Sequence, residues 1–173
     1  MGEIIIITGA SGVGKTSVFE KIKTLLPESD FAFFRFDSIG VPSLEVMIEQ
    51  FGSPSGWQEA KTYEWMERLA KEKGNKTIIF EGQMNMDFIE GALAKNEFDI
   101  YKIVLLDCSE AEMKRRLIED RNQPELANPD MSNWLRFLRN QASEKKIPII
   151  DTTGMTVDQS ANHFISNILA HDH

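Results

Sequence analysis

The chain has 173 residues, of which 42% are hydrophobic and 27% are charged, and its formal net charge is −8. This length fits one domain with a sizeable core, and the acidic balance argues against general nucleic-acid binding, which depends on a basic surface. No apolar run is long enough to span a membrane and no signal peptide is recognisable. We therefore expect a cytoplasmic protein without a nucleic-acid or membrane partner.

The first predicted element is a strand over residues 3–8, built on four consecutive isoleucines. It runs into a full match to G-x-x-x-x-G-K-[ST], and a helix over about 14–26 follows. A chance glycine-rich turn is a poor explanation, because the apolar strand, both glycines, the lysine, the threonine and the amphipathic helix coincide. The predicted nucleotide-binding residues here are Gly9, Ala10, Ser11, Gly12, Val13, Gly14, Lys15, Thr16 and Ser17.

Each part of this loop has a physical reason. Backbone N–H groups in a glycine-rich turn form a nest for phosphate oxygens, and the helix that starts near Gly14 adds the positive end of its dipole. We expect Lys15 to reach the β- and γ-phosphates, the Thr16 hydroxyl to ligate Mg²⁺, and Ser17 to lie near the α-phosphate. The motif predicts a nucleoside triphosphate and Mg²⁺ as ligands.

Strands and helices then alternate along the chain. Further strands are predicted at residues 31–36, 77–80, 101–106 and 147–150, and helices at about 43–51, 57–73, 86–95, 109–121, 131–146 and 156–170. This order indicates an α/β fold with a parallel sheet covered on both faces, whose ligands bind beyond the carboxyl ends of the strands. Polar residues at those ends are Asp37, Glu81, Asp107 and Asp151. The only cysteine, Cys108, ends an apolar run and is expected to be buried and unreactive.

The layout resembles the small P-loop kinases, such as nucleoside monophosphate kinases, shikimate kinase and gluconokinase. The resemblance implies one P-loop NTPase domain over residues 1–173: a three-layer sandwich with a five-stranded parallel sheet in the order 2-3-1-4-5 and helices on both faces. It also implies a helical substrate-binding insertion at about 38–75 and a short lid at about 121–131. The implied activity is ATP- and Mg²⁺-dependent transfer of the γ-phosphoryl group to a small-molecule acceptor.

The resemblance assigns roles to residues that follow the second and third strands. Asp37 would contact the acceptor hydroxyl near Mg²⁺, although an Asp here can also merely cap a helix. Arg35 points to the same side of its strand, either to bind an anionic substrate group or to neutralise a neighbour. Glu81 would hold a water of the Mg²⁺ ion, or be a structural carboxylate. Gly82 would let a substrate approach the backbone, and Gln83 would hydrogen-bond it.

Arginines form the next group. The segment QPEL looks like the lid of shikimate kinase, where an arginine precedes the proline; here that position is Gln123, so we expect Arg121 to carry the catalytic charge. Arg116 matches an arginine that stacks on adenine. Arg139 matches one that faces a substrate phosphate or carboxylate, and Arg136 lies one turn earlier. At least one of the four is expected to be an ordinary surface residue.

The remaining expectations concern two loops and two tryptophans. Thr152 and Thr153 follow the last strand, where the family wraps the adenine. Trp57 would line a substrate pocket, although helical spacing more often means core. Trp134 is expected to pack near the lid, and Asp107 to cap the helix that begins at Ser109.

These features leave several functions open. A kinase acting on a nucleoside or nucleotide leads, followed by a kinase for a sugar acid, another metabolite or an antibiotic. The segment Asp37-Ser38-Ile39-Gly40 also fits the D-x-x-G pattern of a GTPase switch, but no N-K-x-D follows a later strand. A regulatory nucleotide-binding protein is the third class. ATP is the expected donor, with another purine triphosphate left open. The protein is expected to be a monomer or a homodimer.

Overall fold

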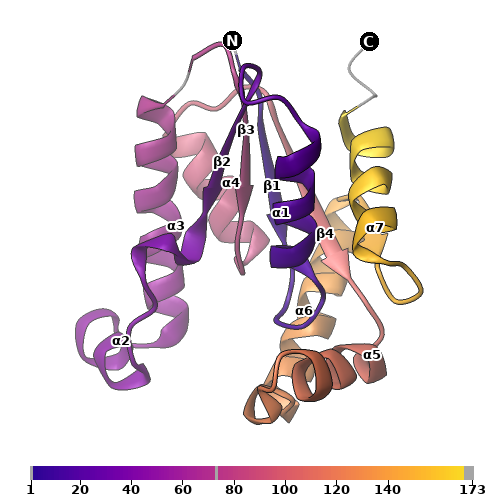
Figure 1. The fold of residues 1–173 in the computed structure, drawn as a ribbon. Helices are drawn as coiled ribbons and strands as arrows, with labels where there is room; N and C mark the ends of the chain where they lie inside the picture. Colours follow the sequence, from indigo (N-terminus) through magenta and orange to yellow (C-terminus); the bar gives the residue numbers. More distant parts are fainter. Residues whose placement is uncertain (1, 73, 170–173) are drawn as a thin grey trace.

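The computed structural model describes residues 2–72 and 74–169 and is built around a five-stranded, all-parallel sheet (Figure 1). The strand order is β2-β3-β1-β4-β5, as the resemblance implied. The strands are β1 (Ile4–Thr8), β2 (Phe31–Arg35), β3 (Thr77–Glu81), β4 (Tyr101–Asp107) and β5 (Ile149–Asp151). Central β1 pairs with both β3 and β4, which explains why its four isoleucines are fully buried.

Helices connect the strands and cover both faces of the sheet. They are α1 (Lys15–Leu25), α2 (Leu44–Phe51), α3 (Pro54–Lys71), α4 (Met86–Lys95), α5 (Glu110–Arg115), α6 (Pro129–Lys145) and α7 (Val157–Phe164). Short 3-10 turns lie at Phe36–Ile39 and Pro124–Leu126, and π-helical turns at Arg116–Asp120 and Ile165–Leu169. In the part of the chain that the structure describes, none of these helices has the length and apolarity to cross a membrane.

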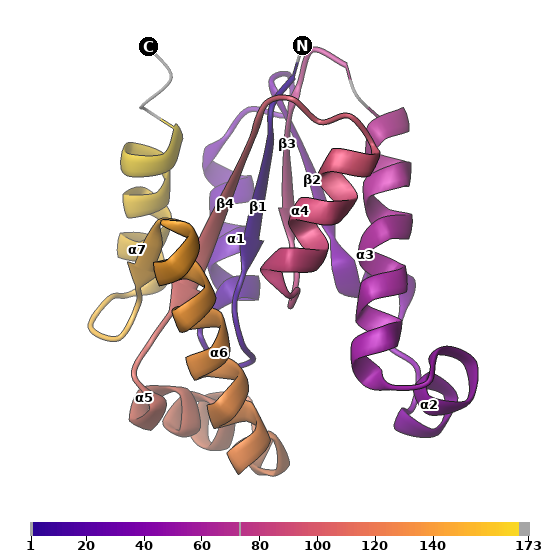
Figure 2. The ribbon, with the colours of Figure 1, turned by 180° about the vertical axis from the view of Figure 1, so that it is seen from behind.

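The alternation of side chains along β1 divides the core into two layers. Ile4 and Ile6 point to the face that packs against α3, α4 and α6, whereas Ile5 and Ile7 point to the face covered by α1 and α7. Figures 1 and 2, which view the molecule from opposite sides, show these two helical layers with the sheet between them. The result is the predicted three-layer sandwich.

The helix boundaries differ from the predicted ones where capping residues were read as breaks. The helix predicted from about residue 57 begins at Pro54, because the Ser53 hydroxyl accepts a hydrogen bond from the Gly56 N–H at 2.9 Å and a proline suits the first turn. The helix predicted over 109–121 changes at Arg116 from α to π geometry. The predicted ends at residues 73 and 170 lie outside the described residues.

Candidate active site

The phosphate loop lies between β1 and α1, at the carboxyl ends of the strands, where the fold places its ligands. Gly14 is the N-cap of α1 and has a φ of +96°, in the left-handed region that favours glycine. A Cβ atom on Gly9 would lie 2.5 Å from the carbonyl oxygen of Leu106 in the neighbouring strand. Both glycines of the motif are therefore required by the backbone, and this geometry fits the predicted phosphate-binding role of the loop.

A cavity of about 520 Å³ opens in front of this loop and gathers predicted residues from several parts of the chain. Figure 1 shows α2 and α5 on opposite sides of this end of the sheet. The predicted residues that line the cavity are Gly12, Val13, Gly14, Lys15, Thr16, Ser17, Arg35, Asp37, Arg116, Arg121 and Thr152. Loop, second strand, lid region and last strand thus meet around one space.

Lys15 is a buried cation at the floor of the phosphate loop. Its ammonium group donates a hydrogen bond to the carbonyl oxygen of Ala10 at 3.0 Å, within the loop itself. Burial lowers the pKa of Lys15 to about 8; Glu81 and Asp37 oppose this shift, and Arg121 adds to it. Lys15 therefore has a lower proton affinity than an exposed lysine. A bound phosphate oxygen could replace the Ala10 carbonyl oxygen as the acceptor of its hydrogen bond.

The residues expected to hold Mg²⁺ supply oxygen ligands, which this hard cation prefers. The Thr16 side chain is exposed to the cavity and Asp37 lines it, while Glu81 is buried nearby. Burial raises the pKa of Glu81, and the positive charges of Lys15 and Arg35 counteract that rise. No group of three or more acidic, His or Cys residues within 2–72 and 74–169 could bind a metal unaided. The donor set fits an ion held largely by phosphate oxygens and water.

Arg35 is an internal neutraliser in this arrangement. Its Nε lies 3.4 Å from an oxygen of Glu81, and its guanidinium also approaches Glu20 at 3.9 Å and the Thr16 hydroxyl at 3.5 Å. Of the two predicted roles for Arg35, neutralising a neighbour is the one with a visible partner.

Arg116 ties three segments together beside the loop. Its guanidinium donates to the carbonyl oxygen of Val13 at 3.1 Å, to the hydroxyl and carbonyl oxygens of Thr152 at 2.9 and 2.8 Å, and to Glu112 at 2.9 Å. The loop, the end of β5 and α5 are thereby fixed to one another. The predicted stacking of Arg116 on adenine stays a prediction.

Arg139 and Arg136 are held by carboxylates away from the cavity lining. Arg139 Nε lies 2.6 Å from Asp107, and its Nη2 donates to the carbonyl oxygen of Cys108 at 3.0 Å. Arg136 pairs with Glu110 of α5 at 2.9 Å, at the surface. Asp107 thus anchors α6 to the end of β4 and does not cap α5, whose N-cap is the hydroxyl of Ser109 itself. Both arginines thus have carboxylate partners within the protein, and their predicted contact with a substrate stays a prediction.

Gly82 and Trp57 belong to the core. A Cβ atom on Gly82 would lie 2.5 Å from the Cβ of Phe36, so the packing of Phe36 accounts for the glycine at this position. Trp57 is only 8% exposed and packs edge to face against the same Phe36, with ring centroids 5.6 Å apart. The packing therefore explains Trp57 as a core residue, the alternative that helical spacing favoured.

Gln83 connects the loop to α6 through hydrogen bonds to Ser11 and Trp134, two residues that the sequence named without pairing them with Gln83. Its Nε2 donates to the Ser11 hydroxyl at 2.6 Å, and its Oε1 accepts from the Trp134 indole N–H at 3.1 Å. These partners lie 72 and 51 residues away along the chain, and no local pattern announces such pairs. The phosphate loop is therefore linked by hydrogen bonds to the helix that follows the lid region.

The two threonines after β5 differ in their surroundings. Buried Thr152 donates its hydroxyl to the carbonyl oxygen of Val13 at 2.9 Å and lines the cavity. The Thr153 hydroxyl bonds to Asp151 and accepts from the Ser109 N–H at 2.8 Å, outside the lining of that cavity. Thr152 thus contacts the loop, and Thr153 contacts the N-cap residue of α5. The neighbouring Cys108 is buried, which raises the pKa of its thiol to about 11. The predicted unreactive thiol fits this environment.

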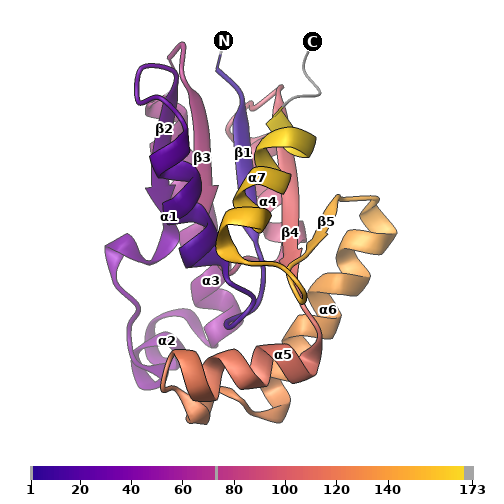
Figure 3. The same ribbon diagram turned by 45° about the vertical axis from the view of Figure 1, so that its right-hand side comes forward.

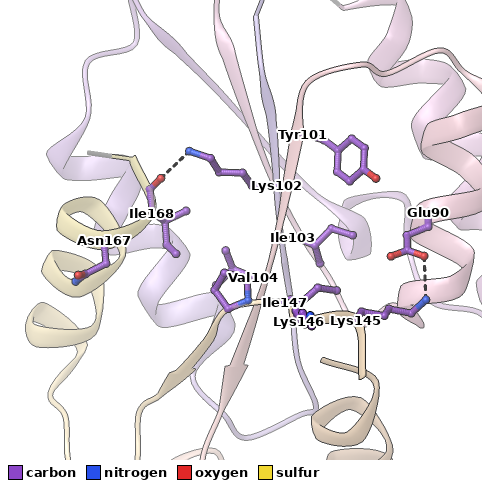
Figure 4. A pocket seen from close by; sticks show the side chains of 11 residues that line it. Glu90, Tyr101, Lys102, Ile103, Val104, Lys145, Lys146, Ile147, Asn167 and Ile168 are labelled. Atoms are coloured by element: carbon purple, nitrogen blue, oxygen red, sulfur yellow. Dashed lines mark hydrogen bonds and ion pairs between the residues drawn. The ribbon is translucent and has the colours of Figure 1, made fainter. Parts of the chain in front are cut away.

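A second cavity, of about 390 Å³, flanks the amino-terminal half of β4 (Figure 4). Two of its three lysines are already engaged: Lys145 pairs with Glu90 at 2.9 Å, and Lys102 donates to the carbonyl oxygen of Ile168 at 2.9 Å. The walls are otherwise mostly apolar, including Ile103, Val104 and Ile147. It offers none of the phosphate-binding features of the first cavity.

Comparisons with known proteins show the fold. Searches found no matching family model and no matching curated protein. Among solved structures, similar chains include shikimate kinase from Acinetobacter baumannii (19% identity, 99% of this chain and 95% of that one, TM-score 0.62). A gluconokinase from Sinorhizobium meliloti matches at 17% identity over 99% and 98% of the two chains, with a TM-score of 0.64. The tunicamycin resistance protein of Deinococcus radiodurans matches at 18% identity over 97% and 96%, with a TM-score of 0.65. The chain thus has the fold of the small P-loop kinases.

Proposed function

We propose that this protein is a phosphotransferase that moves the γ-phosphoryl group of ATP, with Mg²⁺, to a hydroxyl group of a small acceptor. The observation that carries the proposal is the single cavity into which Lys15, Thr16, Asp37 and Arg121 all open. The shared fold supports it, since two of the similar chains are named as kinases. In this proposal residues 38–75 form the acceptor-binding insertion and 121–131 a short lid.

The transfer needs positive charge over the moving group and a base for the acceptor proton. Lys15 and Arg121 supply the charge, and bound Mg²⁺, held by Thr16 and through water by Asp37 or Glu81, would neutralise the phosphate oxygens. Asp37 orients the acceptor hydroxyl and accepts its proton as the new O–P bond forms and the bond to the β-phosphate oxygen breaks. ADP and the phosphorylated acceptor are the products.

A coupled assay of ADP release tests this proposal on a panel of nucleosides, nucleotides, sugar acids and aminoglycosides. One acceptor is expected to stimulate ADP release, and Asp37→Asn to abolish the stimulation while an ATP analogue still binds by calorimetry. Lys15→Ala is expected to weaken the binding of the analogue itself. The matched control is Asp30→Asn, an exposed aspartate before β2, whereas Asp37 follows β2.

The alternative function is a regulatory nucleotide-binding protein or a GTPase-like switch. Slow hydrolysis of ATP or GTP that no acceptor stimulates, and that Asp37→Asn leaves unchanged, would replace the phosphotransferase with this alternative. Running the assay with both triphosphates also identifies the donor.

A further inference from the structure

We propose that the acceptor of this site is electrically neutral and partly apolar, such as a nucleoside or another uncharged ring bearing a hydroxyl, and that nucleotides, sugar acids and other anions are poor acceptors. This inference rests on the proposed function and adds to it the substrate class.

The first support is the state of the arginines on the acceptor side. An anionic acceptor would need a cation to replace its hydration, because burying an unpaired charge is costly. Arg35, Arg136 and Arg139, the three arginines that the sequence suggested for such an anion, are each paired with a carboxylate, at 3.4, 2.9 and 2.6 Å respectively. An arriving anion would have to compete with these partners.

Two of these pairs are hard to open. Glu81 and Asp107, the partners of Arg35 and Arg139, are 4% and 6% exposed. Withdrawing Arg139 toward a substrate would leave the buried Asp107 without its counter-charge. Withdrawing Arg35 would leave Glu81 with Lys15 as its remaining nearby cation, and that lysine is needed for the triphosphate. Only the pair formed by Arg136 lies at the surface, and it faces α5 through Glu110.

The remaining cations belong to the donor. Lys15 lies in the phosphate loop, and Arg121 is close enough to help lower its pKa. Within residues 2–72 and 74–169 the guanidinium of Arg121 has no hydrogen bond or ion pair, and it lines the same cavity as the loop. Both charges are required to balance a triphosphate.

The proposed insertion itself carries no cation where it follows Asp37. From residue 36 to residue 60 the sequence contains no Lys, Arg or His, whereas it contains Asp37, Glu45, Glu49 and Glu59. The next cation, Lys61, pairs with Glu64 at 2.8 Å. An anion in this part of the site would meet negative charge without a compensating positive group.

The same segment instead exposes apolar side chains. Ile39 and Val41 precede α2, and Leu44 and Ile48, four residues apart on one face of α2, are 60% and 52% exposed. Figure 3 shows α2 beyond the carboxyl ends of the strands. Asp37 lies in the turn that follows the carboxyl end of β2. The four apolar side chains lie outside the lining of the 520 Å³ cavity, so they would contact the apolar portion of an uncharged acceptor that extends beyond the cavity, and they give no attraction to an anion.

The test compares acceptors in matched pairs that differ in charge, at a fixed saturating concentration of ATP. The probes are thymidine with thymidine 5′-monophosphate, uridine with uridine 5′-monophosphate, and glucitol with gluconate. In any pair that the enzyme phosphorylates, we expect the kcat/KM of the neutral acceptor to be at least tenfold higher than that of the anionic acceptor. A higher kcat/KM for the anionic member would overturn the inference and leave the proposed phosphotransfer intact.

Variants then test the apolar surface. Leu44→Ser and Ile48→Ser are expected to raise the KM for the neutral acceptor at least fivefold, without changing the Kd of an ATP analogue or the Tm. Leu25→Ser, at an exposed leucine at the end of α1, is the control and is expected to change nothing. Unchanged KM values in both α2 variants, or a dimer that dissociates on Leu44→Ser, would assign this surface to another contact and overturn the apolar part.

Failure of the underlying function has a different signature. If none of the six probes, nor the wider panel, stimulates ADP release while the analogue still binds, the phosphotransfer proposal fails and the inference falls with it.

Discussion

Replacing Arg139 by leucine separates a structural from a catalytic role for this residue. In the structure the Arg139 guanidinium donates to both oxygens of Asp107, at 2.6 and 3.2 Å, and to the carbonyl oxygen of Cys108. The side chain of Asp107 is 8% exposed and that of Arg139 is 41% exposed. The change would therefore leave a nearly buried carboxylate without its cation.

The magnitude follows from that geometry. Removing one partner of a fully buried pair costs about 3–5 kcal/mol, whereas a single hydrogen bond to a charged group contributes about 1.5–3 kcal/mol. Because water reaches part of the Arg139 side chain, we expect a loss of about 2–3 kcal/mol in the free energy of unfolding. At about 2–4 °C per kcal/mol for a domain of this size, the Tm should fall by roughly 5–10 °C.

The assay is urea unfolding followed by circular dichroism, with two comparison variants. Arg136→Leu, on the same helix, breaks a pair whose side chains are 54% and 34% exposed, so it should cost no more than about 1 kcal/mol. Adding Asp107→Asn to Arg139→Leu removes the unpaired charge and should recover about 1 kcal/mol. Equal losses for the two arginine variants, or an Arg139→Leu protein of unchanged stability that has lost acceptor-dependent turnover, would refute the structural assignment.

Three further expectations concern the loop and its supports. Burial lowers the pKa of Lys15 to about 8, and phosphate binding needs the protonated form, so the Kd of an ATP analogue should rise as the pH increases above about 8, by up to about tenfold per pH unit. Titration calorimetry from about pH 7 to 9.5 measures this rise. A flat pH profile of the Kd, matching that of Lys15→Met, would contradict the expectation. Gly82→Ala should cost about 1–3 kcal/mol in urea unfolding, because its Cβ would lie 2.5 Å from that of Phe36; wild-type stability would mean that the backbone shifts freely. Trp134→Phe should cost about 1 kcal/mol by losing the indole hydrogen bond to Gln83, and that cost should disappear in a Gln83→Leu background; an equal cost in both backgrounds would assign it to packing.

The sequence predicted best what depends on neighbouring residues. The run Ile4–Ile7, the glycines and Lys15 define strand, loop and helix within one short stretch, and the structure has all three there. The alternation of elements sufficed for the parallel sheet, since each strand needs a helix to return it to the same direction. The strand order came from the resemblance.

Side-chain partners across the fold were not predictable in the same way. Arg139 and Asp107 are 32 residues apart, and Trp134 and Gln83 are 51 apart, so their pairing depends on how α6 lies against the sheet. The sequence indicated that some arginine near the lid would be an ordinary surface residue, but the identity of that residue depends on which carboxylate faces it. Trp57 was ambiguous because helical spacing is the same for a core residue and a pocket residue.

The shortness of β5 has a consequence for the behaviour of the protein at high concentration. β5 pairs with β4 only along Leu105–Asp107, so the preceding part of β4 has a sheet edge that β5 does not cover. Uncovered edges are templates for intermolecular strand pairing and aggregation. Here three lysines, Lys102, Lys145 and Lys146, line the cavity beside that edge (Figure 4), and a second chain docking there would have to displace Lys102 from the Ile168 carbonyl oxygen and Lys145 from Glu90. The edge is protected by charge in place of a longer strand.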